Sequence, residues 1–401
     1  MDNHHIKKIG LIFLGPFPEG NVSTLRIVSY CKSLSANGCL VKVYLIAPTT
    51  EAKVNQVEKG VFEGIEFEYV NGITWPNNNV SFFYKYIQYF KGIILTVKRL
   101  KSDNIKCLLS YHSEIFANIY FKVACKILSI NFVLDKTEYP KSFQEKNRIG
   151  LFFENISLRF FDKIITISNE LFIYYKYFLG LKDDSLFLLP MTIDKDRYAN
   201  IIPNLTSEKY IAVVFGVHNR DNILNSIKAY IKYLELVQHY NLNFSFKLKM
   251  IGDFKKLCEL FPTNKIIIDL IEENNIHNKV EILGSLPSEA VPKILLNATC
   301  LLSTPDFFIS GGFPTKLGEY LLSGNPVVVT AAGEIENYLT HLENAFLSEP
   351  GNIDKIAEYL IMIQTDENLA SKIGVSGQKL AKLVFNADSY VESLKSFIFR
   401  K

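Results

Sequence analysis

Short apolar runs alternate along the chain with longer segments in which apolar residues recur every three to four positions. The short runs are typical of buried strands, and the longer segments are typical of helices that cover a sheet. Repetition of strand, helix and strand predicts an α/β fold with parallel sheets. The expected strands lie at 8–14, 40–46, 107–110, 131–134, 210–215, 246–251, 280–283, 299–304 and 327–330. A further strand begins at 162 and runs directly into a helix, for which Ser168 or Asn169 is the expected cap.

The remaining pattern adds a β-hairpin at 61–73 and an amphipathic helix at 82–101. A single helix is expected after the strand at 246–251, running to about Asn274, and the last helix is expected at 387–399. A chain of 401 residues is too long for one ordinary core. Because the alternation restarts at 210, we expect two domains.

The segment 310–330 predicts a loop, a short helix and a buried strand, with clear signals at both junctions. Pro314 suits the first helical position, and Gly324 suits a left-handed helix end. Pro326 prevents continuation just before the β-branched run at 327–330. The helix is therefore expected to have two to three turns, with its free N–H groups directly after Gly311 and Gly312.

Three polar residues share one face of this expected helix. Thr315 and Glu319 are four residues apart, and Lys316 and Glu319 are three apart. The cation and the hydroxyl suit phosphate oxygens, whereas the carboxylate would repel them and suits a diol such as a ribose. Together with the helix start, these groups predict a site for a nucleotide diphosphate.

The run FPTKLGEYLLSGNPVV at 313–328 resembles the donor-site signature of family 4 glycosyltransferases, which are retaining enzymes. Glu319 matches the second glutamate of that pattern, and the first falls on Gly311. The resemblance implies the GT-B fold, in which two Rossmann-like domains face each other across a cleft. It implies an N-terminal acceptor-side domain at 1–195, a nucleotide-sugar domain at 205–380 and a C-terminal helix, 381–401, that returns to the first domain.

The resemblance also implies a set of site residues. Lys316 and Glu138 are the expected catalytic residues, although a buried salt bridge is an equal alternative for Glu138. Acceptor-side groups are expected at His112 and Lys136, with a structural role open for His112. Arg26 follows the first loop and is expected to be either a cleft residue or a solvated one. The donor-binding residues are expected to be Gly15, Arg220, Gly311, Gly312, Phe313, Thr315, Lys316 and Glu319.

Composition narrows the possible partners and cofactors. The six cysteines form no C-x-x-C pair, which favours buried free thiols over zinc or disulfides. No D-x-D pair is placed to bind a metal, so we expect neither metal nor cofactor. Residues 1–200 hold 25 Lys and Arg against 19 Asp and Glu, a balance of +6, whereas 201–401 hold 19 against 22, a balance of −3. Apart from this positive excess, no basic face and no known module predicts nucleic-acid binding, so we expect no nucleic-acid partner.

The basic, aromatic-rich helix at 82–101 could lie at a membrane interface or simply cover the sheet. We expect a cytoplasmic protein with weak, salt-sensitive association with the inner leaflet. The predicted function is transfer of a sugar, with retention, from a nucleotide-diphosphate sugar to a glycan or lipid-linked acceptor. The alternatives are a nucleotide-sugar epimerase of the GT-B type and a catalytically silent module that binds nucleotide sugars.

Overall fold

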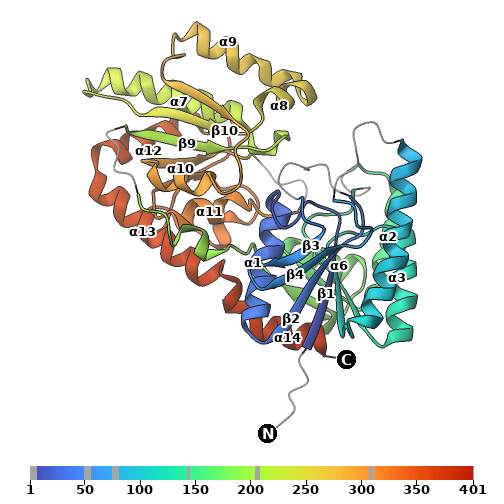
Figure 1. Ribbon diagram of the computed structural model, residues 1–401. Helices are drawn as coiled ribbons and strands as arrows, with labels where there is room; N and C mark the ends of the chain where they lie inside the picture. The colour runs from blue at the N-terminus through green and yellow to red at the C-terminus, as the bar shows by residue number, and fades with distance from the viewer. Residues whose placement is uncertain are drawn as a thin grey trace. The chain divides into compact units, whose positions relative to one another are not determined.

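The computed structural model describes residues 7–48, 56–74, 81–141, 145–203, 208–306 and 311–400. The chain divides into two compact units. Unit 1 comprises Met1–Asp194, Ile309–Gly312 and Asn386–Lys401, and unit 2 comprises Lys195–Phe308 and Phe313–Phe385. Each unit consists of a largely parallel sheet with helices packed against it, which confirms the predicted α/β class (Figure 1).

The sheet of unit 1 has the strand order β3-β4-β2-β1-β5-β6-β7-β8. All neighbours pair in parallel except β3 and β4, which form the predicted hairpin. Ile9 of β1 pairs with Val41 on one side and Cys107 on the other, so β1 lies in the centre. The strands are β1 (Lys7–Phe13), β2 (Cys39–Leu45), β3 (Lys59–Phe62), β4 (Ile65–Tyr69), β5 (Cys107–Ser110), β6 (Asn131–Lys136), β7 (Lys163–Thr166) and β8 (Leu186–Leu188).

Local capping sets the start of several helices in unit 1. The side chain of Asn21 accepts hydrogen bonds from the backbone N–H groups of Ser23 and Thr24, and Ser168, one of the two expected cap residues, caps its helix. These bonds satisfy N–H groups that have no partner inside the helix. The helices are α1 (Val22–Ala36), α2 (Phe82–Ser102), α3 (Ile115–Leu128), α5 (Arg148–Leu158), α6 (Asn169–Phe178) and α14 (Val391–Phe399).

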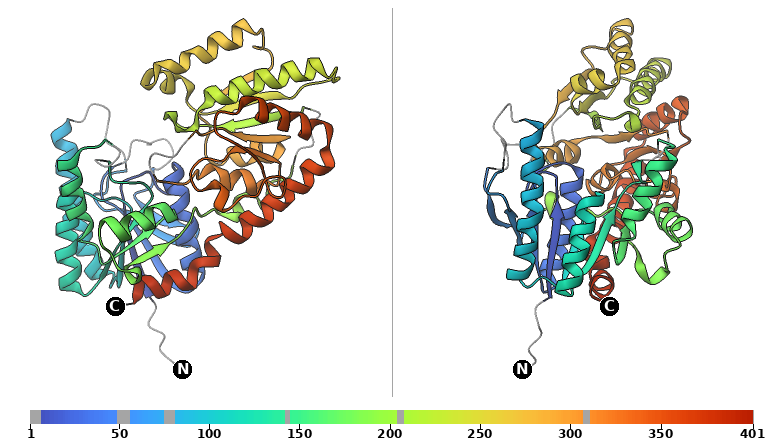
Figure 2. Two further views of the ribbon diagram at one scale, coloured as in Figure 1. Left: turned by 180° about the vertical axis from the view of Figure 1, so that it is seen from behind. Right: turned by 90° about the vertical axis from the view of Figure 1, so that its right-hand side faces the viewer.

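The C-terminal helix α14 belongs to unit 1, although it follows unit 2 in the sequence. It contacts α1, and the side-chain amide of Asn131 donates to the carbonyl of Ile398 at 2.9 Å. The predicted helix at 387–399 is split by the structure into a 3₁₀ turn, Ala387–Tyr390, and α14. In Figure 2 the chain can be traced, in red, from the long helix α13 (Glu367–Val384) to this last helix.

Unit 2 has a six-stranded parallel sheet in the order β11-β10-β9-β12-β13-β14. Its strands are β9 (Tyr210–Val214), β10 (Lys247–Ile251), β11 (Val280–Gly284), β12 (Cys300–Ser303), β13 (Val327–Thr330) and β14 (Phe346–Ser348). Its other helices are α7 (Ile223–His239), α8 (Phe254–Leu260), α9 (Ile266–Glu273), α10 (Val291–Asn297), α11 (Lys316–Leu322) and α12 (Ile353–Thr365). The chain thus builds outward from β9 in both directions, which is the order of a Rossmann fold.

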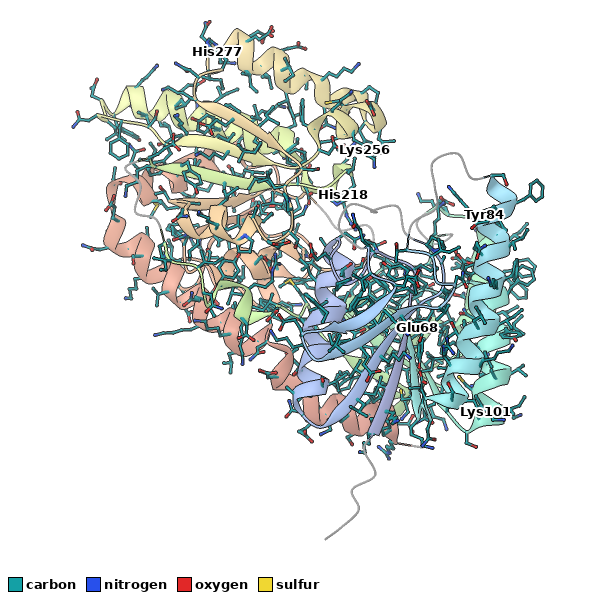
Figure 3. The ribbon with its side chains drawn as sticks, viewed as in Figure 1. Glu68, Tyr84, Lys101, His218, Lys256 and His277 are labelled. Atoms are coloured by element: carbon teal, nitrogen blue, oxygen red, sulfur yellow. The ribbon has the colours of Figure 1, made fainter. Side chains whose placement is uncertain are left out.

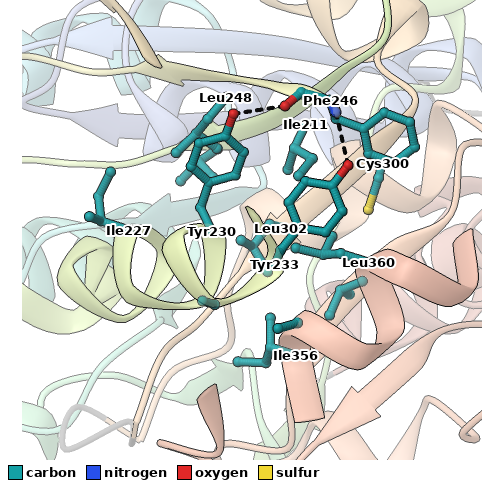
Figure 4. Packing of buried hydrophobic residues seen from close by; sticks show 14 of the residues in the cluster. Ile211, Ile227, Tyr230, Tyr233, Phe246, Leu248, Cys300, Leu302, Ile356 and Leu360 are labelled. Carbon is teal, nitrogen blue, oxygen red and sulfur yellow. Dashed lines mark hydrogen bonds between the residues drawn. The ribbon is translucent and has the colours of Figure 1, made fainter. Parts of the chain in front are cut away.

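The core of unit 2 contains two tyrosines of α7 that are fully buried together with their hydroxyl groups. The hydroxyl of Tyr230 donates to the carbonyl of Phe246 at 2.7 Å, and the N–H of Phe246 donates to the hydroxyl of Tyr233 at 2.8 Å (Figure 4). A buried polar group without a partner would cost about 1–3 kcal/mol, so these bonds allow two large rings to fill the core. They also fix α7 against the start of β10.

One predicted element was wrong. The single helix expected after β10 is two helices, α8 and α9, separated by the 3₁₀ turn Pro262–Lys265. Pro262 lacks a backbone N–H and its ring clashes with the preceding turn, so it ends α8.

All six cysteines are buried and free, as the spacing predicted.

Candidate functional site

The sheet of unit 2 places two loops side by side where its strand order reverses. β9 and β12 are neighbours, and the chain leaves β9 toward β10 on the other side. Ligands of open α/β sheets bind at such a point, beyond the carboxyl ends of the strands. The loop after β9 holds His218 (Figure 3), and it continues into a 3₁₀ turn, Asn219–Asp221, that leads to α7. The segment after β12 leads to α11.

Hydrogen bonds tie the two loops together at this point. The side chain of Asn225 donates to Asp306 at 2.9 Å, and Asn222 donates to the same carboxylate. The hydroxyl of Thr304 donates to the carbonyl of Asn222 at 3.0 Å and lies 2.7 Å from the hydroxyl of Ser226. The loops therefore form one fixed framework around the carboxyl ends of β9 and β12.

Helix α11 is held against this framework by Tyr320. Its hydroxyl accepts a hydrogen bond of 2.6 Å from the N–H of Val214, the last residue of β9. Leu317, Leu321 and Leu322 are buried, as the pattern predicted, and Gly324 has a φ of +80° at the helix end. The helix begins at Lys316, two residues after Pro314, and is only seven residues long. The side-chain charges on α11 therefore matter more than its short dipole.

Lys316 forms an ion pair with Asp221 in unit 2, and both side chains are largely buried. Burial alone would raise the pKa of Asp221, but Lys316, His218 and the N–H of Gly216 outweigh it, so the pKa of Asp221 is lowered. Burial lowers the pKa of Lys316 from 10.5, although Asp221 opposes that shift. Asp221 therefore stays ionised and holds the lysine at the sheet edge.

Arg220 comes directly before Asp221 and is exposed. Because Asp221 pairs with Lys316, Arg220 lies near that lysine, and its charge adds to the lowering of the pKa of Lys316. The structure thus brings together Lys316 and Arg220, the two cations predicted to meet a diphosphate. It adds Asp221, which the sequence analysis missed because no motif marks a carboxylate 95 residues away from its partner.

Glu319 lies on the same helix and is fixed by the segment that opens unit 2. Nη1 of Arg197 donates to Oε1 of Glu319 at 2.6 Å, and the hydroxyl of Tyr198 donates to the carbonyl of Glu319 at 3.0 Å. Arg197 also donates to the carbonyl of Ser288 at 2.6 Å. Both anchors come from the 3₁₀ turn Lys195–Tyr198, and sequence analysis assigned neither to the site.

The other residues of the predicted donor motif contribute mainly through their backbone or through packing. Phe313 is buried, and its ring lies 5.2 Å from that of Tyr338 and 5.6 Å from that of Phe385. The side chain of Thr315 makes no capping hydrogen bond. Gly311 and Gly312 are buried and group with unit 1; Gly311 has a φ of +66°, a conformation that only glycine adopts readily.

The sheet of unit 1 has its own reversal point, between β1 and β5. Gly15 follows β1, and His112 follows β5. The ring of Phe13 lies between these two residues. A Cβ atom on Gly15 would lie 2.4 Å from the Phe13 ring, and the His112 ring stacks on it with the ring centroids 5.5 Å apart. Lys136 ends the next strand, β6, with Glu138 two residues later. The structure therefore brings Gly15, His112, Lys136 and Glu138 to one edge of the sheet.

His112 has a strongly lowered pKa at this edge. Burial, with a smaller effect of Lys136, lowers its pKa to about 4, so it is neutral near pH 7. Its Nε2 atom is buried and has no hydrogen-bond partner in the part of the chain that the structure describes. Burial also lowers the pKa of Lys136, while Glu154 and Glu138 oppose that shift. A buried nitrogen without a partner is a place where a ligand hydroxyl could bind.

Arg26 has neither of the two roles expected from the sequence. Its side chain is 2% exposed and donates to both carboxylate oxygens of Asp135, at 3.1 and 3.0 Å. It also donates to the carbonyl groups of Leu189 and Pro190. Arg26 is thus neither solvated nor a cleft residue, because a bidentate pair and two carbonyls use its donors within unit 1. Among the described residues, no group of three or more His, Cys, Asp or Glu side chains is arranged to hold a metal ion.

Comparison with known proteins finds similarity to one protein family, to curated relatives and to solved structures. Residues 195–380 match the family Glycosyl transferases group 1. The match covers the region that contains Asp221, Lys316 and Glu319. The chain is 25% identical over 239 residues to poly(glycerol-phosphate) alpha-glucosyltransferase of Bacillus subtilis, covering 58% of this chain and 32% of the relative. It is 21% identical over 193 residues to N-acetyl-alpha-D-glucosaminyl L-malate synthase of Bacillus anthracis, covering 48% and 46%.

These matches span from about a third to about a half of the curated relatives' own length. Solved structures match over nearly the whole chain. Sucrose-phosphate synthase from Thermosynechococcus elongatus has a TM-score of 0.71 at 14% identity, with 97% of this chain and 98% of that chain covered. Anabaena Alr3699/HepE in complex with UDP and glucose has a TM-score of 0.68 at 17% identity, with 98% and 100% covered. The fold is that of GT-B glycosyltransferases, with two Rossmann-like units.

Proposed function

We propose that the protein is a glycosyltransferase of the group 1 type that uses a nucleotide-diphosphate sugar. The observation that carries this proposal is the placement of Lys316 and Glu319 on one helix at the reversal point of the unit 2 sheet. A cation suits the diphosphate, and a fixed carboxylate one turn later suits the ribose diol. The family match over residues 195–380 and the likeness to a structure that holds UDP support the same assignment.

In the proposed reaction, the bond between the sugar C1 atom and the β-phosphate oxygen breaks. The hydroxyl oxygen of the acceptor bonds to C1 and gives up its proton to the leaving diphosphate, so that the products are the glycoside and the nucleoside diphosphate. Lys316 and Arg220 stabilise the negative charge that grows on the leaving diphosphate, because oppositely charged groups placed in advance need little reorganisation. Metal ions are not required in this scheme. Retention of configuration at C1 rests on the resemblance of the donor motif.

Unit 1 supplies the acceptor-side groups in this proposal. Glu138 is the candidate catalytic residue there, with His112 and Lys136 as groups that bind the acceptor. Gly15 and the motif residues Gly311, Gly312, Phe313 and Thr315 are assigned to the donor through their backbone or close packing. We propose a glycan or lipid-linked acceptor and a cytoplasmic location at the inner leaflet. No nucleic acid takes part.

A donor panel tests the proposal directly. The full chain is incubated with UDP-, GDP- and ADP-linked sugars, and nucleotide release is measured with and without candidate acceptors and with and without EDTA. We expect one donor class to give acceptor-dependent release that EDTA does not change. Conversion of donor without acceptor would instead identify an epimerase. Donor binding in calorimetry without turnover on any acceptor would identify a silent binding module, and strict dependence on metal would contradict the proposed charge stabilisation.

A further inference from the structure

Helix α2 has an apolar outer face, although it is already well packed on its inner side. Ile93 and Leu100 are buried, and a Cβ atom on Gly92 would lie 1.9 Å from the carbonyl oxygen of Ile46, so the helix approaches the sheet as closely as glycine allows. Large apolar side chains nevertheless follow the opposite side at helical spacing. They are Phe83, Ile87, Phe90 and Ile94, with exposed fractions of 77%, 62%, 48% and 48%.

Helix α3 extends this surface. The two helices contact each other and lie side by side in the views of Figures 1 and 2. Phe116 is 75% exposed and Ile127 is 76% exposed, and further apolar residues between them are also exposed. We call the exposed side chains of Phe83, Ile87, Phe90, Ile94, Phe116 and Ile127 the apolar face. Contiguous exposed apolar surface of this kind is rare on soluble proteins and marks an interaction site.

Positive charge accompanies the apolar face, and negative charge is absent from both helices. The sequence of α2 contains five Lys and Arg residues and no Asp or Glu, and α3 contains two Lys and no Asp or Glu. Toward the end of α2 the same spacing brings Lys98 and Lys101 onto this side of the helix, and both lysines are exposed. Figure 3 marks the two ends of this helix with Tyr84 and Lys101. Apolar side chains flanked by lysine are typical of helices that lie in the headgroup region of a membrane.

We propose that the apolar face and the lysines beside it dock on an anionic lipid bilayer. A second copy of the chain fits less well, because it would bring two positively charged faces together. An anionic surface instead attracts each nearby Lys or Arg. No helix among the described residues is long and apolar enough to cross a membrane, so the contact is with the surface layer of the lipid. Phenylalanine and isoleucine side chains then enter the boundary between headgroups and acyl chains.

This proposal sharpens the expectation from sequence, which was weak association with the membrane that salt disrupts. Charge attraction is screened by salt, whereas burial of apolar side chains is not. We therefore expect binding that weakens in high salt but persists. The proposal extends the inner-leaflet location proposed above but does not rest on sugar transfer. If the membrane proposal fails, donor binding by unit 2 is unaffected. Donor calorimetry on the same variants therefore tests the proposed function separately from membrane binding.

Vesicle sedimentation with the full chain tests the proposal. The probes are phosphatidylcholine vesicles with and without phosphatidylglycerol, at low and high salt. We expect binding that needs phosphatidylglycerol and falls about tenfold in the double variant Phe90→Ser/Ile94→Ser, because two apolar side chains no longer enter the lipid. Leu260→Ser, at a residue of unit 2 that is 58% exposed, is the matched control and should bind as the wild type does.

A probe on the face itself measures insertion. All six native cysteines are buried, so Ile94→Cys should take up a polarity-sensitive dye selectively. We expect its emission to shift to the blue when anionic vesicles are added. Absence of binding at low salt, equal binding by Phe90→Ser/Ile94→Ser, or complete release at high salt without a blue shift would each overturn the proposal. A dimer that Phe90→Ser dissociates, without vesicle binding, would assign the face to self-association instead and overturn it as well.

Discussion

Nη1 of Arg197 lies 2.6 Å from Oε1 of Glu319, and both side chains are only 14% exposed. Hydrogen bonds between charged groups are short and about twice as strong as neutral ones. The carboxylate of Glu319 is therefore held in place within unit 2 before any ligand binds. A carboxylate has about four acceptor sites, so this pairing is compatible with two further bonds from the hydroxyl groups of a ribose.

Replacement of Glu319 by alanine should remove most activity. If its carboxylate accepts both ribose hydroxyls, Glu319→Ala leaves them unpaired in a half-buried site and should cost about 2–4 kcal/mol in kcat/KM. Arg197 would also lose its partner, so donor calorimetry should show weaker binding. Glu289→Ala, at an exposed glutamate of unit 2, is the control. Wild-type kinetics in a folded Glu319→Ala protein would refute the assignment of Glu319 to the donor.

The order of strands and helices could be predicted from the sequence because its signals are local. Gly324 and Pro326 mark the junction between α11 and β13 within three residues, and Ser168 marks the start of α6 in the same way. Lys316 and Glu319 could be assigned because one helix face and one known motif hold them both. Such features depend on residues that are close in the sequence.

The partners of these residues could not be predicted, because they depend on the tertiary fold. Arg197 reaches Glu319 across 122 residues, and Arg26 reaches Asp135 across 109. Nothing near either arginine in the sequence distinguishes a buried partner from solvent. The same holds for the apolar face, since the pattern of α2 fits a packing helix equally well until the exposed fractions are known.

The buried pair of Arg26 and Asp135 should contribute strongly to stability. Asp135→Ala leaves a buried guanidinium without its carboxylate, and removal of one partner from such a pair costs about 3–5 kcal/mol. The free energy of unfolding, measured with urea, should fall by about 3–5 kcal/mol. The double variant Arg26→Met/Asp135→Leu should regain much of the loss, because it removes both charges together. A loss below about 1 kcal/mol in Asp135→Ala would mean that solvent reaches the arginine.

The lowered pKa of His112 predicts sensitivity to acid. The pKa is about 4 in the folded protein and 6.5 in the unfolded chain, so the unfolded chain takes up the proton first as the pH falls. Stability from this group is complete above pH 6.5 and is lost between pH 6.5 and 4, by about 2 kcal/mol at pH 5. His112→Gln should reduce the difference in unfolding free energy between pH 7 and pH 5 by that amount. His277→Gln, at an exposed histidine, should leave the difference unchanged.

Lys316 should act mainly on the chemical step. Negative charge on the diphosphate grows as the bond to C1 breaks, so a nearby cation stabilises the transition state more than the bound donor. Lys316→Ala should therefore lower kcat by a larger factor than it raises KM, as steady-state kinetics can measure. A raised KM with an unchanged kcat would mean that Lys316 only binds the donor.

The environment of Lys316 also predicts the alkaline limit of activity. Burial lowers the pKa of Lys316 below 10.5 and the Asp221 carboxylate opposes that shift, so kcat/KM should fall as the pH rises through a value below 10.5. Asp221→Asn removes the opposing charge and should move this limit to lower pH. Lys316→Arg should abolish it, because a guanidinium keeps its proton. Lys355→Ala, at a surface lysine, is the control; an unchanged limit in Lys316→Arg would assign the titration to another group.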